Sequence, residues 1–367
     1  LLAIVRLLPH FREESRAYYQ SKEWKCFIMR NDEEEDKFFK SKNVFGIDIY
    51  SPLKIFNGEY ENVVNYVDKQ LSSLFIGLKN EKGFKVIKDD CEKACSDSET
   101  SADIYDKELE VEKSLNEKLF SEKEKVAKVL FERAGIITGQ ISGAITENFK
   151  DREEGIDLVD YGCGDGLVTY LLDKYLKNNN KMNLNRVLLV DVCDYLADDV
   201  GNKVKNKSYE FMDIDPDDPV VENMEVKEEE YDCILILTVL HHASSPYEVF
   251  QICHRLLKPG GIMLVIESCV GITETETKEI KENKEAVDEF RKLIREEQIL
   301  YAIFVDWFYN RVVHDENIYV PYNFNTPDGW VEMFEKFNMI KCVEMHSKGF
   351  DQVVVPEFHV LYKLLKE

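Results

Sequence analysis

The chain has 367 residues and a formal net charge of −24, with 47 lysines and arginines against 71 aspartates and glutamates. This balance disfavours a protein that holds a phosphate backbone over a wide area, so no extended nucleic-acid surface is expected. The sequence contains no run of about 18 uncharged apolar residues, so no membrane span is expected either.

Nine cysteines are scattered along the chain, several of them within apolar runs. The scatter and the odd number are typical of a reducing compartment. Because the first residues also lack a secretory cleavage pattern, a cytoplasmic location is expected. Cys91 and Cys95 lie close together, but they have no further Cys or His nearby to complete a zinc site. No metal site is therefore expected.

Residues 1–110 are expected to form a small N-terminal α+β unit that ends in an acidic linker. Alternating apolar residues at 45–50 predict a strand, and an apolar stripe over 63–78 predicts a helix. Residues 84–87 are interpreted as another short strand. Asp, Glu, Ser and Thr crowd residues 89–110, a composition typical of a linker or mobile loop.

Residues 111–367 are expected to form the second domain, which opens with two helices divided at Gly135. From residue 156 onward, strand patterns alternate with helix patterns. The expected strands are 156–160, 186–191, 208–212, 231–237, 261–267, 340–345 and 357–364, and the expected helices are 166–177, 196–204, 246–257 and 326–338. This alternation predicts an α/β fold, with a seven-stranded, mainly parallel sheet and helices on both faces. The last two strands, joined without a helix, predict a C-terminal antiparallel hairpin.

A glycine turn follows the first core strand. Gly162, Gly164 and Gly166 have the spacing G-x-G-x-G, which differs from the G-x-G-x-x-G of dinucleotide-binding proteins. Glycines permit positive φ and a close backbone approach, and the N-terminus of the next helix attracts polar or anionic groups. Asp160, just before the turn, would repel a phosphate. It suits a ligand that carries a cationic amino group.

Acidic residues also end the next two expected strands. Asp191, at the end of the second strand, can accept hydrogen bonds from both hydroxyls of a ribose. Asp213, at the end of the third, can accept from an adenine amino group, with Ile214 against the ring. Because open α/β sheets bind ligands at the carboxyl ends of their strands, these acids are expected to line one binding crevice.

Two further motifs complete the pattern: Leu240-His241-His242 after the fourth strand, and the turn Lys258-Pro259-Gly260-Gly261 before the fifth. Together with the glycine turn, the acids and the terminal hairpin, they resemble the class I (Rossmann-like) S-adenosylmethionine-dependent methyltransferases over roughly 155–364. The resemblance implies S-adenosylmethionine as cofactor. The positions that it implies for cofactor binding are Asp160, Gly162, Cys163, Gly164, Gly166, Asp191, Val192, Asp213, Ile214, Leu237 and Thr238.

Methyl transfer relies on positioning, and a general base is needed only where the acceptor must lose a proton. The predicted catalytic residues are His242, Glu267 and His314. For His242 the alternative is a structural role, or a position that only borders the cofactor. For Glu267 the alternative is a carboxylate bonded to nearby backbone or to a positive side chain.

An insertion at about 270–325 is expected to form a lid over the acceptor. Its helical region, 290–313, ends in a cluster of aromatic and polar residues, such as a small-molecule pocket needs. Asn310 and Arg311 are the predicted acceptor-binding residues. The alternative is a hydrophobic helix packed on the sheet, with Asn323 and Asn325 serving turns.

These features predict a methyltransferase that acts on a small-molecule acceptor. One alternative is a methyltransferase for protein or RNA, with residues 1–110 as the recognition module. Another is a binding protein that has kept the fold without catalysis, and the intact Asp160, Gly164 and Asp191 argue against it.

Overall fold

The computed structural model gives the fold of most of the chain. The residues that it describes are 42–44, 47–49, 51–78, 80, 82–98, 101–120, 123–152, 154–180, 182–192, 194, 196–214, 228–243, 245–272, 284–313, 322–337, 339–349 and 357–367. Within these ranges, no helix combines the length and the apolar character needed to cross a membrane.

A seven-stranded sheet forms one half of the molecule, with the strand order β5-β4-β3-β6-β7-β9-β8. Its parallel strands are β3 (Ile156–Tyr161), β4 (Leu184–Asp191), β5 (Glu210–Asp213), β6 (Tyr231–Leu237) and β7 (Leu257–Ser268). Antiparallel pairing joins β9 (His359–Lys366) to β7 and to β8 (Ile340–Gly349). The predicted sheet and C-terminal hairpin are confirmed.

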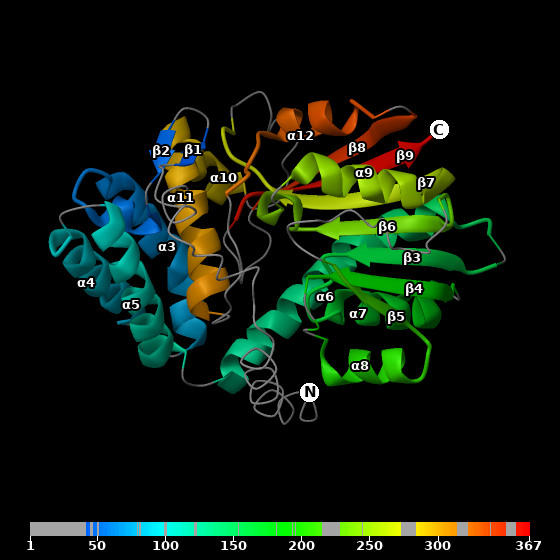
Figure 1. Ribbon diagram of the computed structural model, residues 1–367, viewed down its shortest axis with the longest axis horizontal. Helices are drawn as coiled ribbons and strands as arrows, with labels where there is room; N and C mark the ends of the chain where they lie inside the picture. Colours follow the sequence, from blue (N-terminus) through cyan, green and yellow to red (C-terminus); the bar gives the residue numbers. More distant parts are fainter. Residues whose placement is uncertain are drawn as a thin grey trace.

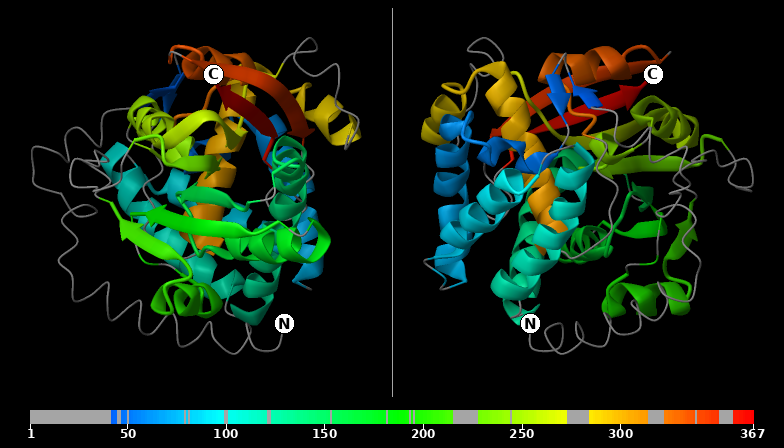
Figure 2. Two further views of the ribbon diagram at one scale, coloured as in Figure 1. Left: turned by 90° about the vertical axis from the view of Figure 1, so that its right-hand side faces the viewer. Right: turned by 60° about the vertical axis from the view of Figure 1, so that its left-hand side comes forward.

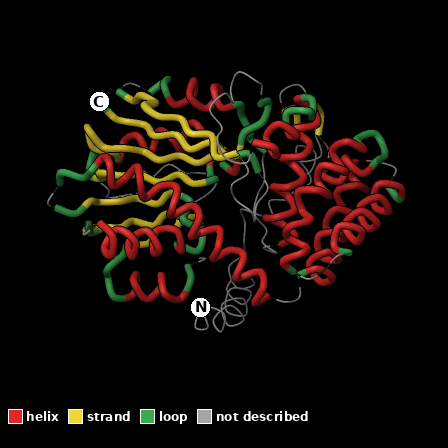
Figure 3. The backbone as a smooth tube through the Cα atoms, turned by 180° about the vertical axis from the view of Figure 1, so that it is seen from behind, coloured by secondary structure: helices red, strands yellow, loops and turns green. Residues whose placement is uncertain are grey.

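Helices cover both faces of this sheet (Figures 1 and 3). The helices around it are α6 (Lys123–Asn148), α7 (Leu167–Tyr175), α8 (Asp198–Lys205), α9 (Pro246–Leu256) and α12 (Pro327–Phe334). Neighbouring residues of β3 enter different cores: Leu158 joins the cluster that holds Leu172 of α7, and Val159 joins the cluster that holds Phe250 of α9. Since both faces are buried, β6 is apolar along most of its length, as expected of a central parallel strand.

A helical unit lies beside the carboxyl ends of the parallel strands (Figures 1 and 2). Its N-terminal part comprises β1 (Lys42–Val44), β2 (Ile47–Ile49), η1 (Pro52–Phe56), α3 (Glu61–Gly77), α4 (Gly83–Ser96) and α5 (Ser101–Leu119). Its other part is the insertion between β7 and β8: α10 (Lys284–Phe290), α11 (Arg295–Trp307) and η4 (Phe308–Val313). Tyr66 and Tyr301 join the two parts with ring centroids 4.9 Å apart.

Three local expectations for the N-terminal half are wrong. Residues 84–87 lie in α4 and not in a strand, and the acidic segment 89–110 is largely helical in α4 and α5. Helix α4 buries Ile87, Cys91 and Ala94 at helical spacing, so burial of one face outweighs its polar composition. Gly135 does not divide α6, because a glycine costs a helix only about 1 kcal/mol relative to alanine. The domain boundary at residue 110 stays a prediction.

Candidate active site

The glycine turn, residues 162–166, has the backbone that its sequence predicts. Gly162, Gly164 and Gly166 have φ of +74°, +54° and +71°. A Cβ at Gly162 would lie 2.4 Å from Val239 Cγ2, and one at Gly166 would lie 2.7 Å from Val200 Cγ1. At Gly164 a Cβ would meet no atom of the described residues within 4 Å. The backbone at Gly164 is therefore the part of the turn that a ligand can approach.

Asp191 ties this turn to the end of β4. Its Oδ2 accepts a hydrogen bond of 2.6 Å from the Gly164 N–H, and its Oδ1 accepts one of 2.7 Å from the Val192 N–H. Its backbone carbonyl accepts from the Ile214 N–H at 2.9 Å. These contacts fix the Asp191 carboxylate beside the glycine turn, and its contact with a ribose stays a prediction.

Asp160 is buried at the end of β3, where its Oδ2 accepts a hydrogen bond of 2.7 Å from the Thr169 hydroxyl. Burial raises the pKa of Asp160 to about 7; the Thr169 bond opposes the shift, and the charges of Asp191 and Asp165 add to it. Near neutral pH this carboxyl is therefore divided between its two forms, and a nearby cation would favour the ionised one.

Other predicted cofactor contacts lie around the same edge. Asp213 is exposed at the end of β5, in register with Asp191, and Ile214 packs on the sheet core. Cys163 and Leu237 are buried. The structure thus gathers the predicted positions at the carboxyl ends of neighbouring strands, while their contacts with a cofactor stay a prediction.

Thr238, which follows β6, has an unusual conformation for a β-branched residue, with φ of +60°. Its hydroxyl accepts a hydrogen bond of 3.1 Å from the Arg133 guanidinium of α6. Burial lowers the pKa of Arg133, while the charges of Glu357 and Asp165 oppose that shift. Sequence reasoning missed Arg133, because a single arginine within a helical pattern carries no motif signal.

Glu267 is fully buried at the carboxyl end of β7. Its Oε1 accepts hydrogen bonds from the N–H groups of Val239 and Leu240, at 2.9 and 2.6 Å. Its Oε2 lies 2.6 Å from His241 Nδ1. These contacts hold the short helix η3 (Leu240–His242) to the sheet, which favours the structural alternative for Glu267 over a catalytic role.

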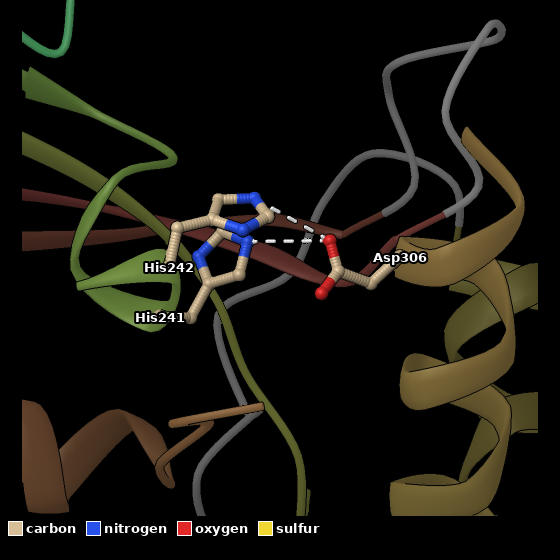
Figure 4. A group of neighbouring side chains, drawn as sticks. All are labelled: His241, His242 and Asp306. Carbon is tan, nitrogen blue, oxygen red and sulfur yellow. Dashed lines mark ion pairs between the residues drawn. The ribbon is translucent and has the colours of Figure 1, made fainter. Parts of the chain in front are cut away.

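His241 and His242 face Asp306 of α11 (Figure 4). Asp306 Oδ1 lies 3.4 Å from His242 Nε2 and 3.7 Å from His241 Nε2. Burial opposes the charge of His241, but Glu267 and Asp306 outweigh it and raise the pKa of His241 well above its usual value. Burial, together with the neighbouring His241, lowers the pKa of His242. Residues 241–242 and 306 thus meet between the sheet and the helical unit.

The two predicted acceptor residues point to different surroundings. Asn310 donates a hydrogen bond of 2.7 Å to Asp306 Oδ1 and therefore lies beside the histidine pair. The Arg311 Nε lies 3.2 Å from Glu112 Oε1, so Arg311 joins η4 to α5 and its contacts do not support acceptor binding. The predicted catalytic residue His314 lies outside the described residues.

Comparison with known proteins matches residues 159–265 to a family described as a methyltransferase domain. A ubiquinone biosynthesis O-methyltransferase of Roseobacter denitrificans is 27% identical over 136 residues, which cover 36% of this chain and 50% of that protein. One of Maricaulis maris is 29% identical over 126 residues, 33% of this chain and 42% of that protein. The chain thus spans about half the length of the curated relatives that it matches.

Solved structures of methyltransferases are also similar to part of the chain. The CurJ carbon methyltransferase has a TM-score of 0.43 at 16% identity, covering 81% of this chain and 70% of its own. The 1,6-didemethyltoxoflavin-N1-methyltransferase of Burkholderia thailandensis has a TM-score of 0.38 at 12% identity, covering 62% of this chain and 78% of its own.

The sheet order and the glycine turn after the first parallel strand define a Rossmann-like α/β fold. Residues 159–265 match the methyltransferase-domain family, and the sheet has the fold of the class I S-adenosylmethionine-dependent methyltransferases. The cofactor of that family is S-adenosylmethionine.

Proposed function

We propose that the protein transfers a methyl group from S-adenosylmethionine to a small-molecule acceptor at the carboxyl edge of the sheet. The observation that carries this proposal is the glycine turn, whose Gly164 backbone is open to a ligand and is held by Asp191. Asp160 would face the cationic amino group of the cofactor, and Asp191 its ribose. Thr238, at the end of the neighbouring strand β6, would lie near the sulfonium.

When bound, S-adenosylmethionine would supply an electrophilic methyl group on a sulfonium, with the neutral thioether as its leaving group. The enzyme mainly has to align donor and acceptor. His242 has the position to border the acceptor, since its side chain is 21% exposed and lies next to Asp306 of the helical unit. Glu267 would act indirectly, by fixing the segment that carries both histidines.

Helix α11 places Asp306 opposite the histidine pair at the strand ends, while its aromatic residues Phe304 and Trp307 pack on the N-terminal helices. The names of the curated relatives, which are ubiquinone biosynthesis O-methyltransferases, agree with a small-molecule acceptor.

A protein or RNA acceptor recognised by residues 1–110 is the second candidate. Against it, α3 and α5 pack on α11 and η4, so part of their surface is taken up within the helical unit. A recognition module would need that surface for its partner.

Two measurements test the proposal on the full chain. Calorimetric titration with S-adenosylhomocysteine is expected to show one binding site, and absence of binding would refute the methyltransferase assignment. A panel of phenols, amines and carboxylic acids, with peptides and RNA as comparison, is then incubated with S-adenosylmethionine and analysed by mass spectrometry. Methylation confined to the peptides or RNA would refute the small-molecule assignment while keeping the enzyme class.

A further inference from the structure

We propose that His241, His242 and Asp306 bind one divalent transition-metal ion of the zinc type. No metal site was expected from the sequence, because Cys91 and Cys95 have no further Cys or His nearby; no local pattern joins the two histidines to Asp306, which is far from them along the chain. The proposal stands on the contacts of this cluster and holds whether or not the methyl acceptor is a small molecule.

The spacing of the cluster fits an ion better than a set of direct hydrogen bonds. One nitrogen or oxygen from each of the three residues lies within 4.8 Å of the others. The distances from Asp306 Oδ1, 3.4 Å to His242 and 3.7 Å to His241, exceed the usual range of N–H···O bonds, about 2.7–3.2 Å. Two ligand atoms at about 2.0–2.1 Å from one tetrahedral ion lie about 3.4 Å apart.

The surroundings of the cluster orient its side chains as metal ligands are usually oriented. A histidine ligand commonly donates its second ring N–H to a carboxylate, which fixes the ring and its tautomer. Glu267 Oε2, at 2.6 Å from His241 Nδ1, supplies that carboxylate and leaves Nε2 facing Asp306. Asn310 donates to Asp306 Oδ1 at 2.7 Å and fixes the third ligand.

Asp306 carries an unsatisfied oxygen. The residue is 1% exposed, and within the described part of the chain its Oδ2 has no hydrogen-bond partner. A buried carboxylate oxygen without a partner is costly. An ion bound through Oδ1, the oxygen that faces both histidines, would offset the cost of burying this carboxylate.

The ligand types select the class of ion. Two imidazoles and one carboxylate suit Zn²⁺, Fe²⁺ or Co²⁺, whereas Mg²⁺ and Ca²⁺ prefer oxygen ligands throughout. Three protein ligands would leave a fourth position for water or for another oxygen donor. His242 would then be a metal ligand, a role different from direct proton transfer.

Zinc binding by the full chain tests the site. The protein is dialysed against a chelator and titrated with Zn²⁺ in competition with a chromophoric chelator, and one equivalent is expected to bind. Co²⁺ at the same site is expected to give visible d–d absorption bands. His242→Ala and Asp306→Asn are each expected to weaken binding by more than the roughly 10–100-fold lost when a residue that only orients a ligand is changed.

The matched control is His346→Ala, which removes an exposed histidine of β8 that pairs with Glu344. Its zinc affinity is expected to equal that of the wild type. Asn310→Ala keeps all three ligands and is expected to weaken binding by about tenfold, so it tests the site even where a ligand variant does not fold. Thermal unfolding followed by circular dichroism checks each variant.

Three outcomes would overturn the proposal. Absence of zinc binding by the wild type would leave His241 as an imidazolium paired with Glu267 and Asp306. Unchanged affinity in His242→Ala, Asp306→Asn and Asn310→Ala would place the ion elsewhere. A near-ultraviolet thiolate-to-cobalt band that disappears in Cys95→Ser would assign the ion to cysteine. Affinity for S-adenosylhomocysteine, measured in parallel, keeps this test separate from that of the enzyme class.

Discussion

Asp160 joins two opposing requirements at one side chain: its burial favours the neutral acid, and a cationic ligand needs the carboxylate. Because its pKa is raised to about 7, the ionised fraction of Asp160 increases as pH rises from 6 to 8. We expect the affinity for S-adenosylhomocysteine to rise over this range and then level off, as calorimetry can measure. Asp160→Asn should bind more weakly and lose this pH dependence; a parallel rise in the variant would show that another group is responsible.

The raised pKa of Asp160 also makes the ligand-free protein less stable as pH rises. Folded Asp160 keeps a proton that the unfolded chain has already lost above its ordinary pKa of 3.8. The stability that this retained proton contributes is present at low pH and is lost as pH rises through about 7. The free energy of unfolding falls by on the order of 1 kcal/mol for each pH unit. Urea unfolding at pH 5, 6 and 7 should show a smaller fall for Asp160→Asn than for the wild type. Equal falls would contradict the shift.

Gly164→Val tests whether the cofactor approaches the backbone of the turn. Valine would fill the open space over Gly164 and adopt a left-handed conformation, so we expect loss of S-adenosylhomocysteine binding. Gly260→Val is the matched control, because Gly260 has φ of +76° and its Cβ would also meet no atom of the described residues within 4 Å. Both variants should lose about 1–2 kcal/mol of stability. Only Gly164→Val should lose binding, and retained binding would refute the placement of the cofactor.

Residue types predicted where the glycine turn and the strand-end acids lie, because these residues fall within short stretches of sequence; that they bind the cofactor stays a prediction. The acceptor side was harder to predict. Arg311, predicted from its place in the aromatic and polar cluster, is held by Glu112, whereas Asp306, which faces the histidine pair, was not predicted. Contacts between residues so far apart in sequence depend on how the helical unit packs, which local patterns do not specify.

Among the elements, η3 depends most clearly on one distant side chain, because Glu267 binds the backbone of Val239 and Leu240 as well as His241. Glu267→Ala would leave buried N–H groups without a partner, so we expect a loss of about 3 kcal/mol or more in the free energy of unfolding. Urea denaturation can measure it. Full stability with loss of methyl transfer would instead indicate a catalytic role for Glu267.

The strands of the sheet were predictable because buried parallel strands are continuous apolar runs. Helix α4 was not, since Phe84-Lys85-Val86-Ile87 has strand-like composition and becomes helical by packing Ile87 with the rest of the helical unit. The acidic segment that follows was judged by composition, although its buried residues repeat at helical spacing. Local propensity is a weak guide where one face of an element is buried by distant residues.

At the scale of the whole molecule, Glu112 of α5 holds the insertion to the N-terminal helices. It accepts from the Trp307 indole at 2.8 Å and pairs with Arg311, so it joins α5 to both α11 and η4. Glu112→Ala would leave a largely buried guanidinium without this partner, so we expect a loss of about 3 kcal/mol of stability. Hydrogen exchange in α11 should accelerate.

The control is Glu110→Ala on the same helix, where an exposed carboxylate pairs with Lys107. Surface pairs contribute little, so its stability should change by less than about 0.5 kcal/mol. If Glu110→Ala and Glu112→Ala had the same effect, the helical unit would not depend on the buried pair.

The helical unit combines segments that are made early and late in synthesis, so its first helices cannot complete their packing until α11 has been made. The apolar face of α3, with Val63, Val67 and Leu71 fully buried, packs near α11, which leaves the ribosome only after the whole parallel sheet has been made. Domains usually fold from the N-terminus as the chain emerges, but here the first helices must wait for their partner. Nascent chains that end before residue 295 are therefore expected to expose this face to chaperones and proteases, and chains that extend past η4 are expected to protect it.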